Sequence, residues 1–194
     1  GGDVADSLAL GAVRGARGNS GMVLSQVLRG VAESTVDSVI DGDVFARSLQ
    51  QAVELVDRAI AQPVEGTVIT VLKAAAEAAD DAEAQSGATL HSIVSAAIAA
   101  AETALERTPS QLPALREAGV VDAGGAGLVI LLKSLLAEIE GSTGHTGLPE
   151  TEPETELEVV FFFEGDLDAL QVAIEPLGDS LVIARATEDS ANVH

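Results

Sequence analysis

The amino-acid sequence predicts a mainly helical protein, an antiparallel bundle or closed barrel of amphipathic helices, followed by the start of a small α/β domain. Apolar residues recur at three- and four-residue steps from residue 21 to about 140, the spacing of helices with one buried face. Of the 194 residues, 47% are hydrophobic but only 2% are aromatic, so the core must be built from Ala, Val, Leu and Ile. This length suits one large domain, or one domain with part of another.

The helical region divides into segments of similar length joined by short polar loops. A first helix is expected to begin at Met22, with Ser20 as its N-cap, and Asp43 is expected to cap the next one. The further helices are expected over residues 44–60, 66–85, 89–109 and 127–141. The last of them is expected to turn Leu128, Leu131, Leu132, Leu135 and Ile139 inward. Amphipathic helices joined in this way are typical of a helical bundle.

The sequence changes character after residue 140. Residues 141–156 are rich in Gly, Thr, Pro and Glu without an apolar period, which is typical of a linker. In 157–194, "LEVVFFFEG" predicts a strand, "DLDALQVAIEPLG" a helix up to Pro176, and "SLVIARA" a second strand. We therefore expect a helical domain over 1–140 and the beginning of an α/β domain that is incomplete at His194, inside a further strand.

The charge balance excludes several kinds of partner. Ten basic residues against thirty-one acidic ones give a net charge of −21, which argues against nucleic acid and anionic membranes as partners. No segment has the roughly 18–20 uninterrupted apolar residues of a membrane span. The sequence contains no cysteine, which fits the cytoplasm. A nucleotide site in such an acidic chain would need local positive potential, Mg²⁺ or both.

The stretch "VRGARGNSGMVLSQVLRG" at residues 13–30 has the parts of an anion site. Glycines at 15, 18 and 21 allow a sharp turn and close approach to a ligand, and the following helix offers its N-terminal N–H groups. Between Ser7 and Ala32 there are three arginines and no acidic residue. A plain glycine-flanked capping turn remains the alternative, because the stretch lacks the Gly-Lys-Ser/Thr ending of a Walker loop.

Two more glycine-containing loops lead into helices. In "VVDAGGAGLVILL", Asp122 can cap the helix, hold a ribose hydroxyl or help to hold a metal, while Gly124 and Gly125 permit close backbone approach. In "PVEGTVITV", Thr67 stands at a helix start, where a simple N-cap is the alternative role. Alternate helix ends of an up-and-down bundle lie at one rim, so these loops together predict a phosphate-binding rim.

The stretches "GARGNSGMVLSQVLRG", "PVEGTVITVLKAAAEAA" and "VVDAGGAGLVILLKSLL", in this order, resemble the ATP-binding subunit of bacterial fatty-acid kinase. That family is similar in turn to the nucleotide-binding subunit of dihydroxyacetone kinases. The resemblance implies a helical barrel that binds Mg-ATP at one rim, with the γ-phosphate passing to a fatty acid held by a separate acyl-binding protein. It also implies that Gly18, Asn19, Ser20 and Gly21 meet the phosphates, with Thr67, Asp122, Gly124 and Gly125 lining the rest of the nucleotide site.

One motif of that family is absent from the sequence. Its members carry an Asp-Gly-Asp-Thr-Gly type motif whose carboxylates bind Mg²⁺, and nothing of this kind precedes Gly15. The chain is therefore either a fragment whose Mg²⁺ ligands lie upstream, which its start at "GGDVADS" in mid-pattern favours, or a degenerate member of the family. In both cases we expect this chain alone to bind nucleotide weakly and to transfer no phosphate. Of the histidine-rich metal site reported for the family's middle domain only His194 would match, so no metal ligand is assigned.

Two other functions remain open alongside this one. The chain could serve a dihydroxyacetone-type kinase, because of the kinship between the families. It could also be a nucleotide-free helical scaffold that binds a lipid or an acyl-carrying partner through its aliphatic interior. Micromolar binding of Mg-ADP to a chain extended at its N-terminus would support the kinase, and no binding would support the scaffold. Neither the acceptor nor the oligomeric state, including a homodimer, follows from the sequence.

Overall fold

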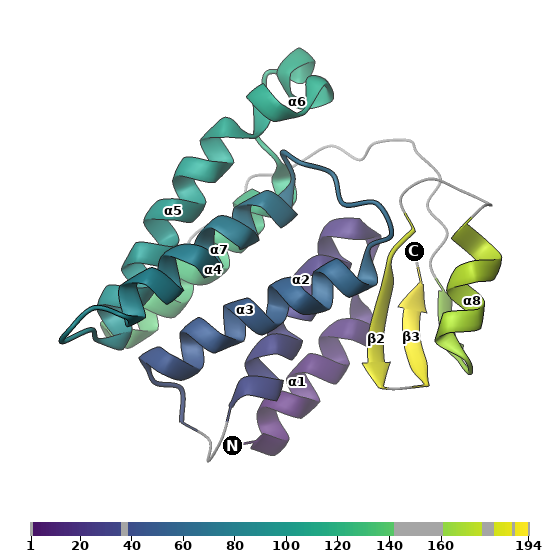
Figure 1. The fold of residues 1–194 in the computed structure, drawn as a ribbon, viewed down its shortest axis with the longest axis horizontal. Coiled ribbons are helices and arrows are strands. Elements are labelled where there is room, and N and C mark those ends of the chain that lie inside the picture. The colour runs from purple at the N-terminus through teal and green to yellow at the C-terminus, as the bar shows by residue number, and fades with distance from the viewer. Residues whose placement is uncertain (1, 36–38, 142–160, 176–180, 188, 194) are drawn as a thin grey trace.

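A computed structural model describes residues 2–35, 39–141, 161–175, 181–187 and 189–193. Its helices are α1 (Gly2–Gly15), α2 (Gly18–Ser34), α3 (Gly42–Ala59), α4 (Val68–Glu83), α5 (Leu90–Gln111), α6 (Pro113–Ala118), α7 (Ala123–Ile139) and α8 (Leu167–Ile174). Its strands are β1 (Phe161–Glu164), β2 (Ile183–Thr187) and β3 (Ser190–Val193). Helices α1 to α7 form one bundle, with the small sheet on its flank and α8 on the outer face of the sheet (Figure 1). The mainly helical fold class is confirmed, whereas α1 and the short α6 were not predicted.

The starts of the helices are set by local hydrogen bonds. Asp41, not Asp43, is the N-cap of α3, because its carboxylate accepts from the N–H of Val44 at 2.9 Å. Thr89 and Ser92 form a reciprocal capping box at the start of α5. The predicted cap Ser20 is wrong, since α2 already begins at Gly18 and Ser20 lies within its first turn. The N-caps are therefore Arg17 in place of the expected Ser20, and Asp41 in place of the expected Asp43.

The main core lies between α2, α3, α4, α5 and α7. Small side chains dominate it, as the composition predicts, and Ala75, Ala79, Ala97 and Ala101 are fully buried. Phe45 is its one aromatic member among the described residues. Because alanine is small, the helix axes can approach closely. Dispersion contacts between the closely packed helices then stabilise a core that has few large side chains. The inward face of α7 follows Leu128 and Leu132, whereas Leu131 is 40% exposed, contrary to expectation.

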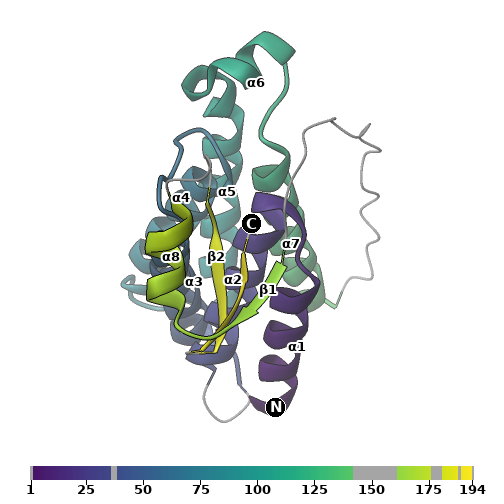
Figure 2. The same ribbon diagram turned by 90° about the vertical axis from the view of Figure 1, so that its right-hand side faces the viewer.

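The sheet is antiparallel, with strand order β1-β3-β2. One of its faces packs on the bundle, where Val182 and Ala184 join Val13 of α1, Met22 of α2 and Ala59 of α3 in a second core. The other face packs on α8. Ile183 and Ala191 of the sheet and Leu167 of α8 are buried in this contact, together with further apolar residues. Figure 1 shows the sheet between the bundle and α8, and Figure 2 views the same sheet and α8 from the side that faces away from the bundle. The predicted strand, helix and strand are therefore present, with the further strand as β3.

The sheet also meets the bundle through specific contacts. A single β-bridge joins Ile60, directly after α3, to Val182. The guanidinium of Arg14 on α1 lies 5.7 Å from the ring centroid of Phe162 on β1. The predicted linker lies almost entirely outside the described residues, so the division of the chain into domains stays a prediction. In the part of the chain that the structure describes, no helix is long and apolar enough to cross a membrane.

Candidate functional site

A cavity of about 200 Å³ lies where α2, α4 and α7 begin. Each of the three predicted loops contributes a polar residue to its lining: Asn19 and Ser20 from the first, Thr67 from the second and Asp122 from the third. Most of the remaining lining is apolar and includes Val182, next to β2. The three loops thus meet at one rim of the bundle, as the sequence predicts. Whether these residues bind a ligand stays a prediction.

The N-terminus of α2 differs from those of α4 and α7. Its N-cap residue is Arg17, whose side chain makes no capping hydrogen bond. The turn into the helix is made at Gly18, whose φ of +66° is the left-handed conformation that suits glycine. The first N–H groups of a helix have no acceptor inside the helix and sit at the positive end of its dipole. An oxyanion in the cavity beside Asn19 and Ser20 would meet this end of α2.

Thr67 is occupied by its own helix start. Its hydroxyl accepts from the N–H of Ile69 at 3.4 Å and donates to the carbonyl of Val64 at 2.8 Å. The capping role is therefore confirmed. To donate to a phosphate, the hydroxyl would have to give up its bond to Val64.

Asp122 joins two of the three helix starts. Its carboxylate Oδ2 accepts from the N–H of Gly125 at 2.6 Å, which makes it the N-cap of α7, and the backbone N–H of Val68 at the start of α4 also stabilises its charge. Burial nevertheless outweighs these bonds and raises the pKa of Asp122 above its ordinary value. A carboxylate held in a cavity at such a cost is a common feature of functional sites.

The two glycines after Asp122 allow close packing of helices. A Cβ on Gly124 would lie 2.6 Å from Ser20 Oγ and 3.1 Å from Val68 Cβ, and one on Gly125 would lie 2.8 Å from Val71 Cγ2. These glycines bring α7 against α2 and α4, which is how the cavity forms. The missing Cβ atoms thus leave room for protein atoms, and close approach of a ligand to the backbone of these glycines stays a prediction.

Other predicted features lie away from the cavity. Gly18 and Gly21 do not line it, and neither do the three arginines that suggested an anion site. Arg14 lies over Phe162, Arg17 donates to the carbonyl of Ala16 at 2.8 Å, and Arg29 pairs with Glu33. The local positive potential here comes from helix ends, without side-chain cations from the described lining. His194 lies outside the described residues.

Thr108 is a site residue that the sequence analysis missed. Its side chain is fully buried at the end of α5, where the hydroxyl donates to the carbonyl of Leu105 at 2.8 Å and accepts from the N–H of Asp122 at 3.1 Å. It therefore fixes the backbone of Asp122 from 14 positions away in sequence. A threonine before Pro109 gives no sequence signal of that contact, because only the fold brings the two together.

The residues present suit the phosphates of a nucleotide better than they suit a metal ion alone. Asp122 is the one carboxylate in the described lining, and nowhere in the described ranges do three or more His, Cys, Asp or Glu side chains gather as a metal site. Mg²⁺ in nucleotide sites is commonly held by one or two carboxylates together with phosphate oxygens and waters. Asp122 could supply one such ligand.

The fold and the cavity together define a helical domain with a polar site at three converging helix starts. Comparison with known sequences then places it: residues 2–137 match the DAK2 domain, and the chain belongs to that dihydroxyacetone kinase-like nucleotide-binding family. The fold, the order of the loops and the family thus agree. A role in nucleotide binding follows at the level of the family, while the particular nucleotide and the acceptor do not.

Relatives of the chain include proteins of Bacillus and Staphylococcus. Protein YloV of Bacillus subtilis is 41% identical over 143 residues, which is 73% of this chain and 26% of that protein. An uncharacterized protein of Staphylococcus saprophyticus is 37% identical over 155 residues, 79% of this chain and 28% of that protein. The chain spans about a quarter of the length of these relatives. The similarity therefore covers one domain of these relatives and does not establish the activity of a whole protein of this kind.

Proposed function

We propose that this chain is the nucleotide-binding domain of a kinase that transfers the γ-phosphate of Mg-ATP to a fatty acid held by a separate acyl-binding protein. The observation that carries the proposal is the cavity at which Asn19, Ser20, Thr67 and Asp122 meet, each beside a helix start. Helix N-termini and backbone N–H groups are a general means of binding phosphate. The DAK2 assignment supports a nucleotide as the phosphate-bearing ligand.

The side chains would divide the work by charge. The N-terminus of α2, with Ser20 in its first turn, would receive a phosphate. Asp122 would repel phosphate when ionised, so it is placed to hold Mg²⁺ or to accept from a ribose hydroxyl. Mg²⁺, when bound, would neutralise phosphate charge in a protein whose net charge is −21. Phosphoryl transfer depends mainly on positioning and charge neutralisation, so no protein nucleophile is required.

The fatty-acid acceptor rests on the resemblance of the three loop motifs to the ATP-binding subunit of fatty-acid kinase. Dihydroxyacetone is the second candidate, because the DAK2 family takes in dihydroxyacetone kinase-like domains. The described residues supply one carboxylate at the cavity and no metal cluster elsewhere, so we expect the 194-residue chain alone to bind nucleotide weakly and to transfer no phosphate. Measurable Mg²⁺-dependent phosphorylation by the purified chain would contradict this expectation.

Nucleotide binding is tested by titration calorimetry with Mg-ADP on the wild type, Asp122→Asn and Asp41→Asn. Both aspartates are N-caps that accept a backbone N–H, and asparagine preserves capping, so the pair separates a ligand role from a structural one. We expect Asp122→Asn to weaken binding about tenfold or more, a typical loss for a charged contact, and Asp41→Asn to leave it unchanged. Equal affinities of the wild type and Asp122→Asn, or equal losses in the two variants, would refute the nucleotide site.

The acceptor is tested in a chimaera of the Bacillus subtilis relative, in which residues 2–137 of this chain replace the matching segment. ATP consumption is measured with a fatty acid on an acyl-binding protein and, separately, with dihydroxyacetone. We expect the chimaera to turn over ATP with the fatty acid, and we expect Asp122→Asn to abolish this turnover. Turnover with dihydroxyacetone alone would favour the second candidate. If the unaltered relative is active with either acceptor and the chimaera is inactive with both, a kinase role for this chain is refuted.

A further inference from the structure

A larger cavity, of about 450 Å³, lies in the groove between α2 and α3 and extends to β2 and α8. None of its lining residues also lines the cavity at the helix starts. Three of the ten basic residues of the chain, Arg29, Arg58 and Arg185, border it against two carboxylates, Glu33 and Asp168. A local excess of positive charge in a chain of net charge −21 is a feature that the proposed function does not use.

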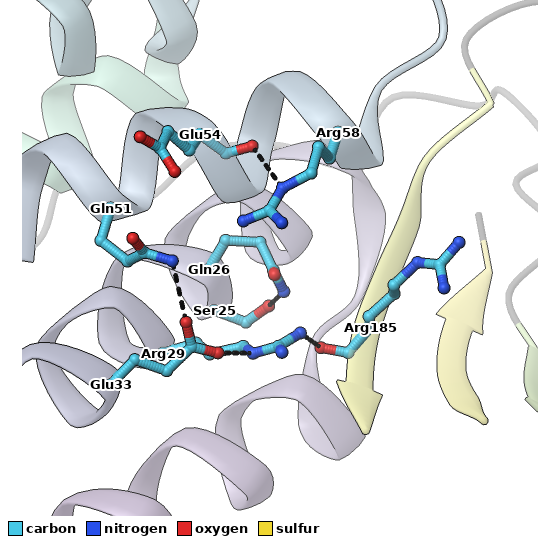
Figure 3. Close-up of polar contacts among 8 residues, drawn as sticks. All are labelled: Ser25, Gln26, Arg29, Glu33, Gln51, Glu54, Arg58 and Arg185. Atoms are coloured by element: carbon cyan, nitrogen blue, oxygen red, sulfur yellow. Dashed lines mark hydrogen bonds and ion pairs between the residues drawn. The ribbon is translucent and has the colours of Figure 1, made fainter. Parts of the chain in front are cut away.

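Two of the three arginines are already paired. Arg29 Nε donates to Glu33 Oε1 at 2.7 Å, and one of its terminal nitrogens donates to the backbone carbonyl of Arg185. The side chain of Arg185 in turn pairs with Asp168. In Figure 3 the Arg185 side chain points away from the groove, while its carbonyl faces Arg29. The carboxylates that line the cavity thus neutralise Arg29 and Arg185.

Arg58 has no such partner. Its Nε donates to the backbone carbonyl of Glu54 at 3.2 Å, and within the described residues no carboxylate pairs with its guanidinium. Glu33, the other carboxylate near the groove, is held on both oxygens, by Arg29 at Oε1 and by Gln51 Nε2 at 2.9 Å on Oε2. Figure 3 shows the guanidinium of Arg58 reaching from α3 into the space above Gln26 and Arg29. Its terminal N–H groups are therefore available to an anion.

Gln26 provides a second, independent observation. Its side chain lines the cavity and the residue is only 1% exposed, yet the amide makes a single hydrogen bond in the described structure, a long one of 3.3 Å from Nε2 to Ser25 Oγ. A buried amide normally has partners for both its carbonyl oxygen and its N–H groups. The unmet capacity of Gln26 faces the same cavity as Arg58, which is the arrangement of a polar ligand site.

From this geometry we propose that the cavity between α2 and α3 binds a small organic phosphate that also carries hydroxyl groups. Arg58, with the free N–H groups of Arg29, would hold the phosphate, which accepts hydrogen bonds from several directions, whereas a planar carboxylate is satisfied by one guanidinium. The amides of Gln26 and Gln51 would meet hydroxyl groups. The cavity volume lies within the roughly 300–1,000 Å³ of small-molecule sites.

The test is titration calorimetry of the 194-residue chain with glucose 6-phosphate, and with glucose, gluconate and inorganic phosphate as comparison ligands. We expect glucose 6-phosphate to bind most tightly and glucose not at all. Arg58→Ala should weaken its binding about tenfold or more, as expected for loss of a charged hydrogen-bonding partner. The control is Arg47→Ala on the same helix, an exposed arginine paired with Asp43 outside the cavity, which should leave the affinity unchanged.

A second variant, Gln26→Leu, should also weaken binding while retaining cooperative unfolding. Equal affinities of Arg58→Ala and Arg47→Ala would show that the ligand binds elsewhere and refute the site. Gluconate binding as tightly as glucose 6-phosphate would refute the phosphate class, and inorganic phosphate binding as tightly would refute the role of the hydroxyl groups. No binding of any ligand at millimolar concentration would refute the proposal outright. Because Arg58 lies outside the Mg-ADP cavity, Arg58→Ala should leave Mg-ADP binding intact.

Discussion

Asp122 is the residue on which the candidate nucleotide site depends most. Its carboxylate caps α7 and is stabilised by the N–H of Val68, yet its burial raises the pKa. A carboxylate used only as a cap would be equally effective in an exposed position, as Asp41 is at the start of α3. The partial burial of Asp122 in a cavity therefore points to a role besides capping.

The pH dependence of stability should reveal this burial. The folded state keeps the Asp122 proton to a higher pH than the unfolded state, so the contribution of this group to the free energy of unfolding is full below the ordinary pKa of 3.8 and is lost as the pH rises through the raised pKa. In urea titrations, the stability of the wild type relative to Asp122→Asn should fall as the pH rises from 3.8 towards neutral. At neutral pH the variant should be at least as stable as the wild type.

The same titrations with Asp41→Asn provide the control. Asp41 is exposed and caps α3 through a comparable bond to Val44 N, so the comparison separates burial from capping. A wild-type advantage over Asp122→Asn that grows with pH would mean that hydrogen bonding outweighs burial at Asp122, which contradicts the stated direction of the pKa shift.

Gly124 should tolerate no larger residue. A Cβ there would lie 2.9 Å from Ser20 Cβ and 3.1 Å from Val68 Cβ, so Gly124→Ala must separate α7 from α2 and α4. We expect a loss of about 1–3 kcal/mol in the free energy of unfolding, typical of overpacking. On the same helix, a Cβ on Gly127 would only contact Leu24 Cδ1 at 3.7 Å. Gly127→Ala should therefore stabilise by up to about 1 kcal/mol. Urea denaturation measures the change in unfolding free energy of both variants. A Gly124→Ala variant as stable as the wild type would disprove the close approach of α7 to α2 and α4 at this position.

At the scale of elements, the candidate site arises because three helices begin at one rim and a fourth holds the third loop in place. The N-termini of α2, α4 and α7 surround the cavity, and Thr108 near the end of α5 bonds the N–H of Asp122. The α5–α7 contact thus positions the carboxylate. The short α6 lies between these two helices in the chain and contributes no buried residue.

Thr108→Val tests this positioning. Valine keeps the volume but leaves the N–H of Asp122 without its acceptor, which should cost about 1–3 kcal/mol of unfolding free energy and weaken Mg-ADP binding as well. Thr103→Val is the matched control, because Thr103 is exposed on the same helix and bonds only its own helix at Ala99 O. It should change stability by less than about 0.5 kcal/mol. Equal effects of the two variants would show that Thr108 does not position the loop.

At the scale of the whole molecule, charge opposes folding. A net charge of −21 produces self-repulsion that salt screens, since the Debye length falls from about 10 Å at 0.1 M to about 3 Å at 1 M ionic strength. Thermal unfolding at pH 7 should therefore shift upward with NaCl, by about 2–4 °C for each kcal/mol of repulsion removed. Near the isoelectric point of about 4.1 the shift should vanish. A midpoint that falls with salt at pH 7 would mean that the exposed ion pairs outweigh the repulsion.

Much of the architecture could be predicted because it is local. The 3.6-residue period placed the helices, and the small, aliphatic composition predicted their close packing. Glycine loops before apolar runs located three helix starts and the polar residues Ser20, Thr67 and Asp122. Boundaries were less accurate: Asp41 rather than Asp43 caps α3, and α2 starts two residues before the predicted cap. At α3 the two aspartates compete for the same N–H groups, whereas α2 begins at Gly18, whose positive φ makes the turn without a side-chain cap from Arg17.

The sequence alone thus determined the class of fold, the helical segments and the candidate phosphate-binding loops, since helix periodicity and helix starts depend on residues within a few positions of one another. Only the tertiary structure decided which groups share a cavity. It separated the arginines of residues 13–30 from the predicted site, brought Thr108 to Asp122, and placed Arg58 beside Gln26. These contacts join residues far apart in the chain, and they exist only because the packing of the helices brings the side chains together.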